Sequence, residues 1–166
     1  MGNGLEPGVE VGPLINEDAV RKVEEHIKDA VQKGARVLLG GGRHEAGGTF
    51  FEPTVLSGAT SEMRLHAEET FGPVVSLFRF KAEDQAIRLA NDTRYGLAAY
   101  FCARDMARIW RVGEALEYGM VGINTGLVST AVAPFGGVEE SGIGREGSKY
   151  GLDEFLEVKY LCMGGT

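Results

Sequence analysis

Apolar residues recur at three- and four-residue steps in the first part of the chain, and this spacing predicts an amphipathic helix over residues 17–33. Asn16 can cap this helix, because its side-chain oxygen can accept a hydrogen bond from an unpaired amide of the first turn. Gly34 follows as the left-handed residue at which helices commonly end. A short strand is predicted next, over residues 36–39.

Further along the chain, continuous apolar runs alternate with helical stripes. The runs predict strands over 74–80, 97–102 and 120–124, and the stripes predict helices over 82–91 and 105–117. The first of these strands, VVSLFRF, has apolar side chains on both faces, as a strand buried on both sides does. The order strand, helix, strand, helix, strand predicts parallel pairing with right-handed crossovers. The sequence therefore predicts an α/β fold built from parallel strand–helix–strand units.

The composition changes after Asn124, and glycine becomes frequent from there to Gly147. A regular helix is excluded in such a stretch, because glycine destabilises helices. Long loops in compact domains are usually either functional or disordered. Pro134, Phe135 and Ile143 give this loop apolar anchors, so we expect it to be ordered and functional.

The end of the chain predicts a short helix over residues 148–155 and a final strand over Leu156–Met163. In that strand apolar and polar positions largely alternate. A strand at the end of a chain is often an edge strand, which can pair with another subunit. We therefore divide the chain into a main part, residues 1–155, and a C-terminal oligomerisation strand with its tail, residues 156–166.

The chain has a formal net charge of −7 at pH 7, which opposes binding to nucleic acid and to anionic membranes. No apolar run approaches the roughly 20 residues that a membrane-spanning helix needs. The first residues, MGNGLEPGVEVG, have neither the basic start nor the apolar stretch of a signal peptide. We therefore expect a cytoplasmic protein that binds neither nucleic acid nor membrane.

Cys102 and Cys162 are too few for a disulfide framework, and both lie in apolar, strand-like runs. Burial among apolar side chains would keep both thiols protonated and inert. The three histidines, His26, His44 and His66, are scattered, and no CxxC or HExxH pattern occurs. The sequence thus predicts two buried structural thiols and no metal site.

Two segments, EETFGPV at residues 68–74 and APFGGVEESGIGREGS at 133–148, resemble segments near the end of NAD(P)-dependent aldehyde dehydrogenases. Three further segments match the same family in order and spacing: VGPLIN at 11–16, FFEPTVL at 50–56 and ANDTRYGLAA at 90–99. Each match is weak by itself. Together they span almost the whole chain, and the resemblance implies a partial aldehyde dehydrogenase catalytic domain.

The segment EETFGPV by itself fits a turn before a strand, with Phe71 in the core and the acidic pair in solvent. A carboxylate beside a strand can also accept two hydrogen bonds from a ribose diol. The resemblance implies this second role, in which Glu69 and Phe71 contact the nicotinamide ribose of the cofactor. This role is the same for NAD and for NADP, so it does not distinguish the two cofactors.

The glycine-rich loop is most similar to that of succinate-semialdehyde dehydrogenases. The resemblance implies that Ser129 helps to hold the distal carboxylate of the substrate and that Phe135 lines the pocket near the aldehyde. From the residues alone, Ser129 could instead bond its own backbone, and Phe135 could simply anchor the loop. Glutarate semialdehyde is an alternative substrate, since one methylene is worth only about 1–3 kcal/mol in discrimination.

In this family a cysteine thiolate attacks the aldehyde, and a glutamate-activated water releases the acid. The resemblance places both groups upstream of the segments seen here, and neither Cys102 nor Cys162 matches the surroundings of the nucleophile. We therefore expect the C-terminal part of a homo-oligomeric dehydrogenase, with no catalytic residue of its own and inactive in isolation. The alternative is a non-catalytic module of the same family that binds a partner or oligomerises.

Overall fold

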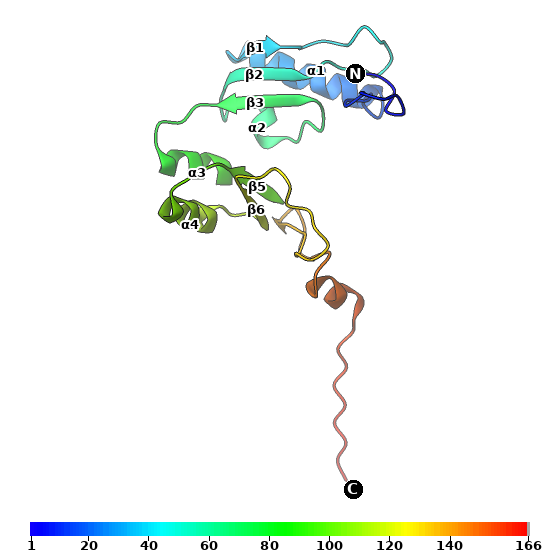
Figure 1. Ribbon diagram of the computed structural model, residues 1–166, viewed down its shortest axis with the longest axis vertical. Helices are drawn as coiled ribbons and strands as arrows, with labels where there is room; N and C mark the ends of the chain where they lie inside the picture. The colour runs from blue at the N-terminus through cyan, green and yellow to red at the C-terminus, as the bar shows by residue number, and fades with distance from the viewer. Residues whose placement is uncertain (166) are drawn as a thin grey trace. The chain divides into compact units, whose positions relative to one another are not determined.

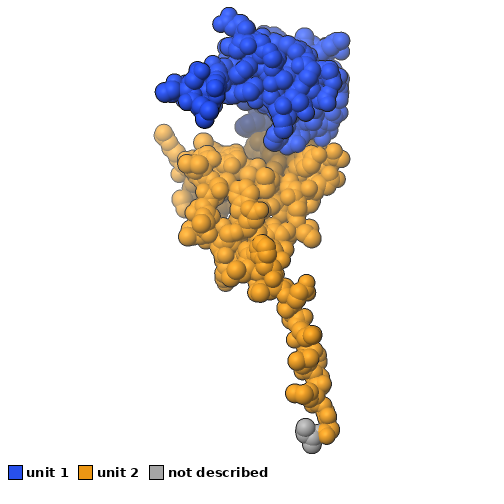
Figure 2. All heavy atoms as spheres, turned by 90° about the vertical axis from the view of Figure 1, so that its right-hand side faces the viewer, with its two compact units in different colours: residues 1–81 blue, residues 82–166 orange. Residues whose placement is uncertain are grey.

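The computed structural model describes residues 1–165, and the chain divides into two compact units, Met1–Lys81 and Ala82–Thr166 (Figure 2). Each unit combines helices with small sheets, one in the first unit and two in the second. The alternation of helix and strand patterns in the sequence is therefore confirmed as an α/β fold.

The first unit is a three-stranded sheet with a long helix on one face (Figure 1). Its elements are α1 (Glu17–Gln32), β1 (Arg36–Leu39), β2 (Thr54–Ala59), α2 (Arg64–Ala67) and β3 (Val74–Phe78). Strand β2 lies in the middle, antiparallel to β1 and parallel to β3. The predicted helix boundaries are confirmed: Asn16 Oδ1 accepts a hydrogen bond from the Ala19 amide at 2.9 Å, and Gly34 has a φ of +98°.

The core of the first unit lies between α1 and the sheet. The apolar stripe of α1 is buried there with side chains from the following segments: Val20, Val23, Ile27, Ala30, Phe51, Leu56 and Met63. Full burial of one such larger side chain stabilises the fold by about 1.5–3 kcal/mol. His26 lies among these residues on α1 and is also fully buried.

Strand β3 departs from its predicted burial. Val74 and Phe78 pack against the core, but Val75 and Leu77 are 56% and 45% exposed. The prediction that this strand is buried on both faces is therefore wrong for this chain. The helices of the unit pack on only one side of the sheet, so the alternate side chains of β3 face outward.

The second unit contains two two-stranded sheets. Its elements are α3 (Glu83–Asn91), β4 (Tyr95–Gly96), β5 (Ala98–Phe101), α4 (Met106–Ala115), β6 (Met120–Ile123), β7 (Val138–Glu139) and the 3-10 helix η1 (Tyr150–Phe155). Strands β5 and β6 are parallel, and β4 and β7 are antiparallel. Asp105 caps α4, with its Oδ1 accepting from the Arg108 amide at 2.7 Å.

The parallel strand–helix–strand unit is confirmed by β5, α4 and β6. The series of strands does not run on from β3, however. Strand β3 pairs with β2, whereas β5 and β6 form a sheet of their own in the other unit. Hydrophobic patterns predict that a strand is present, but its neighbours depend on the whole fold.

The end of the chain differs from its prediction. The helix is confirmed as η1, but Leu156–Met163 forms no strand and pairs with nothing within residues 1–165. Figure 1 shows it as an extended trace beyond η1, and Val158 is fully exposed. A strand requires a neighbour for its amides and carbonyls, and this part of the chain provides none. The separate role assigned to residues 156–166 stays a prediction.

The thiols also differ from their prediction. Cys102 and Cys162 are both exposed, so the expected burial is wrong. Cys102 follows the end of β5, and Cys162 lies in the unpaired C-terminal segment. Within residues 1–165, no three His, Cys, Asp or Glu side chains are grouped to hold a metal. No helix in that range is both long and apolar enough to span a bilayer.

Candidate functional site

The two residues expected to contact the cofactor, Glu69 and Phe71, lie in the first unit between α2 and β3. Glu69 is exposed, and its carboxylate makes no hydrogen bond or ion pair with any described residue. Phe71 is 79% exposed, so it is not a core residue. Its φ of +46° is a left-handed conformation that an aromatic residue rarely adopts. Both side chains are thus available to a ligand.

A network of polar side chains lies directly behind this segment. The buried His26 ring contacts Thr70 Oγ1 through Nδ1 at 3.0 Å and Glu68 Oε2 through Nε2 at 3.2 Å. Arg64 binds the same carboxylate at two points, Nε to Oε1 at 3.0 Å and Nη2 to Oε2 at 2.9 Å. Helix α1 therefore holds both neighbours of Glu69.

The charge state of Glu68 follows from these contacts. The hydrogen bonds from Arg64, and then from His26, lower the pKa of the Glu68 carboxyl to about 2, although partial burial opposes this shift. An ionised carboxylate only accepts hydrogen bonds, so Nε2 of His26 donates to it. In the neutral imidazole Nδ1 then accepts from the Thr70 hydroxyl. For a neutral ring, the ionised Glu68 therefore selects the tautomer that carries its proton on Nε2.

A shallow depression of about 450 Å³ adjoins Phe71. It is lined by Val11, Gly12, Leu14, Phe51, Phe71, Gly72 and Pro73. A Cβ atom on Gly72 would lie 2.5 Å from Val23 Cγ2 of α1, so only glycine allows this close approach. A free carboxylate, an exposed aromatic ring and a largely apolar depression fit the nicotinamide riboside half of a dinucleotide.

In the second unit, Ser129 lies in the loop that follows β6. Asn124, directly after that strand, bonds the backbone of Ala103 through its side-chain amide. Its Oδ1 accepts from the Ala103 amide at 2.9 Å, and its Nδ2 donates to the Ala103 carbonyl at 2.7 Å. Ser129 is exposed, and its hydroxyl bonds no described residue. The alternative role, a hydroxyl bonded to its own backbone, is therefore not what the structure shows.

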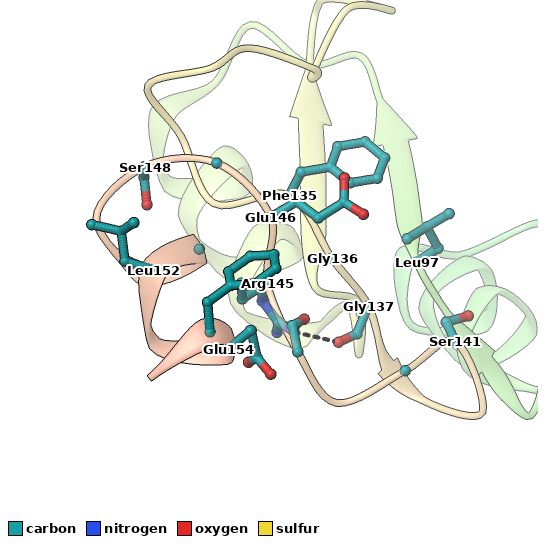
Figure 3. A pocket seen from close by; sticks show the side chains of 15 residues that line it. Leu97, Phe135, Gly136, Gly137, Ser141, Arg145, Glu146, Ser148, Leu152 and Glu154 are labelled. Carbon is teal, nitrogen blue, oxygen red and sulfur yellow. Dashed lines mark hydrogen bonds between the residues drawn. The ribbon is translucent and has the colours of Figure 1, made fainter. Parts of the chain in front are cut away.

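Phe135 is half-buried and lines a cavity of about 650 Å³ (Figure 3). Its backbone exchanges two hydrogen bonds with Glu146, at 2.8 and 2.7 Å. Arg145 Nη1 donates to the carbonyls of Gly137 at 2.6 Å and Gly144 at 2.8 Å. The arginine thus ties the two arms of the loop together beside Phe135.

Glycines in this loop and just before β6 allow close packing. A Cβ atom on Gly119 would lie 2.1 Å from the Gly136 carbonyl oxygen, and one on Gly136 would lie 2.5 Å from that of Gly144. Pro134 and Ile143 are exposed, so they are not the anchors that the sequence suggested. The loop is ordered by backbone contacts and arginine hydrogen bonds rather than by apolar burial.

The structure therefore shows Glu69 and Phe71 in one segment of the first unit, and Phe135 in a cavity of the second unit whose lining does not include Ser129. The sequence did not reveal the network behind Glu69. Its signal was present in His26, a polar residue on the buried stripe of α1, because a buried polar group requires a partner.

The sequence profile of the aldehyde dehydrogenase family matches residues 1–161. The chain belongs to this family, as its motifs suggested. The fold agrees: the structure of succinate-semialdehyde dehydrogenase from Burkholderia pseudomallei superposes with a TM-score of 0.94 at 61% identity, covering 98% of this chain and 34% of that one.

Several named relatives are similarly close in sequence. The chain is 62% identical over 164 residues to an Escherichia coli succinate-semialdehyde dehydrogenase named for NADP(+), and 62% identical over 165 residues to a Pseudomonas aeruginosa glutarate-semialdehyde dehydrogenase. It is 59% identical over 166 residues to a Pseudomonas putida 3-sulfolactaldehyde dehydrogenase. These matches cover 99–100% of this chain but 34% of each relative, so the chain spans about a third of their length.

Proposed function

We propose that this chain is the C-terminal part of an NAD(P)-dependent aldehyde dehydrogenase that oxidises succinate semialdehyde to succinate. The observation that carries the proposal is the near-complete match to enzymes named for small semialdehydes, at about 60% identity. Succinate and glutarate semialdehydes carry a carboxylate, and 3-sulfolactaldehyde carries a sulfonate. All three substrates are short aldehydes with an anionic group at the far end.

In this proposal the first unit contributes to cofactor binding. The nicotinamide, when bound, accepts a hydride from the substrate. Glu69 accepts hydrogen bonds from the ribose hydroxyls, and charge assistance makes such bonds strong. Phe71 packs against the sugar and the edge of the ring. The free carboxylate of Glu69 and the exposed ring of Phe71 support these roles.

The second unit contributes to substrate recognition. The Ser129 hydroxyl donates to the terminal carboxylate of the semialdehyde, and Phe135 forms a wall of the aldehyde pocket. The Ser129 hydroxyl, which bonds no described residue, and the position of Phe135 at a cavity support this assignment. Glutarate semialdehyde is the second candidate, because the relative named for it is as similar as the one named for succinate semialdehyde.

The nucleophile and the general base come from the remainder of a longer protein in this proposal. Cys102 and Cys162 do not correspond to the nucleophile of the family, and both are exposed at the ends of elements or beyond them. A reactive thiolate is normally held in a cationic, partly enclosed environment. The isolated chain is therefore inactive and contributes only binding groups.

The test compares the 166-residue chain with the longer protein that contains it. Reduction of NAD and NADP is followed with succinate semialdehyde, with glutarate semialdehyde, and with butanal as the uncharged analogue. The longer protein should prefer the anionic substrates, and the isolated chain should reduce neither cofactor. If the longer protein turned over butanal as well as the anionic semialdehydes, the substrate assignment would be wrong. If the isolated chain reduced either cofactor, the proposal that the nucleophile and base lie elsewhere would be wrong. A longer protein without dehydrogenase activity would favour the non-catalytic module.

A further inference from the structure

One buried imidazole contacts the residues on both sides of Glu69. His26 bonds Glu68 through one ring nitrogen and Thr70 through the other, and the ring is fully buried. We propose that His26 is a positioning residue that presents Glu69 and Phe71 to the nicotinamide cofactor. This inference rests on the cofactor role proposed above for those two residues.

The direction of Glu69 follows from these two contacts. Glu68 has extended backbone angles, φ −112° and ψ 131°. In extended chain, successive side chains point to opposite sides, so residues two apart share a side. Since Glu68 and Thr70 are both held against the same ring, the side chain between them must point away from α1. Glu69 is accordingly exposed, and its side chain bonds none of residues 1–165.

The backbone at Phe71 depends on the same support. A left-handed φ of +46° is unfavourable for an aromatic residue, and such conformations persist where the surroundings determine them. Thr70 is held on one side by His26, and Gly72 packs within reach of Val23 on the other. Both contacts come from α1, so this helix supports the strained residue from either side.

The two ring nitrogens are not equally important. Glu68 has a second partner, because Arg64 binds its carboxylate at two points. The Thr70 hydroxyl has no partner but His26 among the described residues. Loss of the Nδ1 contact should therefore release the segment, whereas loss of the Nε2 contact should be tolerated. This asymmetry distinguishes positioning from a general contribution of the ring to packing.

Two variants separate the contacts. In His26→Asn the side-chain amide takes the place of Nδ1 and keeps Thr70, and in His26→Gln the amide takes the place of Nε2 and keeps Glu68. Thr70→Val removes the same Nδ1 contact from the other partner, with a side chain of nearly the same size. His44→Gln is the control, because among the described residues His44 Nδ1 accepts only from the nearby Ala46 amide in its own loop.

The variants are made in the longer dehydrogenase that contains this chain. Two quantities are measured: the cofactor dissociation constant without substrate, and backbone hydrogen exchange over residues 68–72. His26→Gln and Thr70→Val should each raise the dissociation constant about fivefold and speed exchange, as expected for one lost hydrogen bond. His26→Asn should stay within about twofold of the unmodified enzyme, and His44→Gln should match it.

Equal effects of His26→Asn and His26→Gln would overturn the inference. The inference would also be overturned if Thr70→Val lowered the melting temperature but left cofactor affinity and exchange over residues 68–72 unchanged. That result would show that the bond between Thr70 and His26 only stabilises the fold. If the unmodified enzyme binds neither NAD nor NADP, the proposed function fails. In that case faster exchange in His26→Gln and Thr70→Val alone still supports positioning of the segment, and unchanged exchange overturns it.

Discussion

Arg64 and Glu68 form a two-point ion pair across one turn of the short helix α2, with Nε–Oε1 and Nη2–Oε2 distances of 3.0 and 2.9 Å. Bidentate pairs of this kind fix orientation as well as charge. Arg64 is also tied to α1, since its amide donates to Asp29 Oδ2 at 2.8 Å. The acidic residue next to Glu69 is thus a structural group.

The ion pair of Glu68 makes stability depend on pH in the acid range. The folded-state pKa of about 2 lies below the ordinary value of 4.5, so the bound carboxylate stabilises the fold above about pH 4.5. That contribution is lost as the pH falls from 4.5 towards 2. We predict that Glu68→Gln lowers the free energy of unfolding at neutral pH and that its difference from the unmodified chain shrinks across this window.

Denaturant unfolding at a series of pH values measures this difference. Glu69→Gln is the matched control, because it makes the same change one residue away on a carboxylate that forms no ion pair in the described part of the chain. Its stability should follow that of the unmodified chain throughout. A Glu68→Gln curve parallel to the unmodified one would contradict the role given to the ion pair.

We predict that Glu69→Gln in the longer dehydrogenase impairs turnover and cofactor affinity and leaves stability unchanged. The side chain is exposed and bonds no described residue, so loss of its charge should leave the free energy of unfolding unchanged. A hydrogen bond to a charged group is worth about 1 kcal/mol more than a neutral one, which corresponds to roughly fivefold in the dissociation constant. Cofactor titration and steady-state kinetics measure the effect, with the exposed Glu45→Gln as control. Unchanged affinity and unchanged turnover would remove Glu69 from the site.

We predict that Ser129→Ala raises KM for succinate semialdehyde in the longer dehydrogenase. One hydrogen bond to a carboxylate is lost, which is worth at most about 1.5–3 kcal/mol. Turnover of butanal should change little, because it offers no anionic group. The neighbouring Thr130→Val deletes a hydroxyl from the same exposed loop and serves as control. Equal losses for both aldehydes would argue against carboxylate recognition.

We predict that the isolated chain associates through Leu156–Met163. This segment is apolar at alternate positions and exposed, and its backbone pairs with no described strand. Exposed strands with free amides and carbonyls tend to pair with another chain. Light scattering should therefore show dimers or larger species at high concentration.

The lysine variants Val158→Lys and Glu157→Lys test the face involved. Each introduces a lysine, the first at a fully exposed apolar position and the second at its polar neighbour. The first should reduce association and the second should not. A clean monomer for the unmodified chain would contradict the prediction.

Local features of the fold were predictable from the sequence. The caps at Asn16 and Asp105, the left-handed Gly34 and the parallel pairing of β5 with β6 all agree with the structure. Each depends on residues close together in the chain or on the single helical crossover between two consecutive strands. Propensity and periodicity describe such local interactions well.

The site was predictable only in part. The motifs led to Glu69 and Phe71, but the support behind them joins residues 42 and 44 positions apart in the chain. The hydrophobic pattern likewise failed to predict that Val75, on the outer face of β3, and Cys102 are exposed. Burial and hydrogen-bond partners depend on which surfaces meet in three dimensions. The sequence alone therefore determined the family, the helices and most strands. Tertiary packing decided how α1 directs Glu69 outward, because a buried imidazole needs a hydrogen-bond partner for each of its nitrogens.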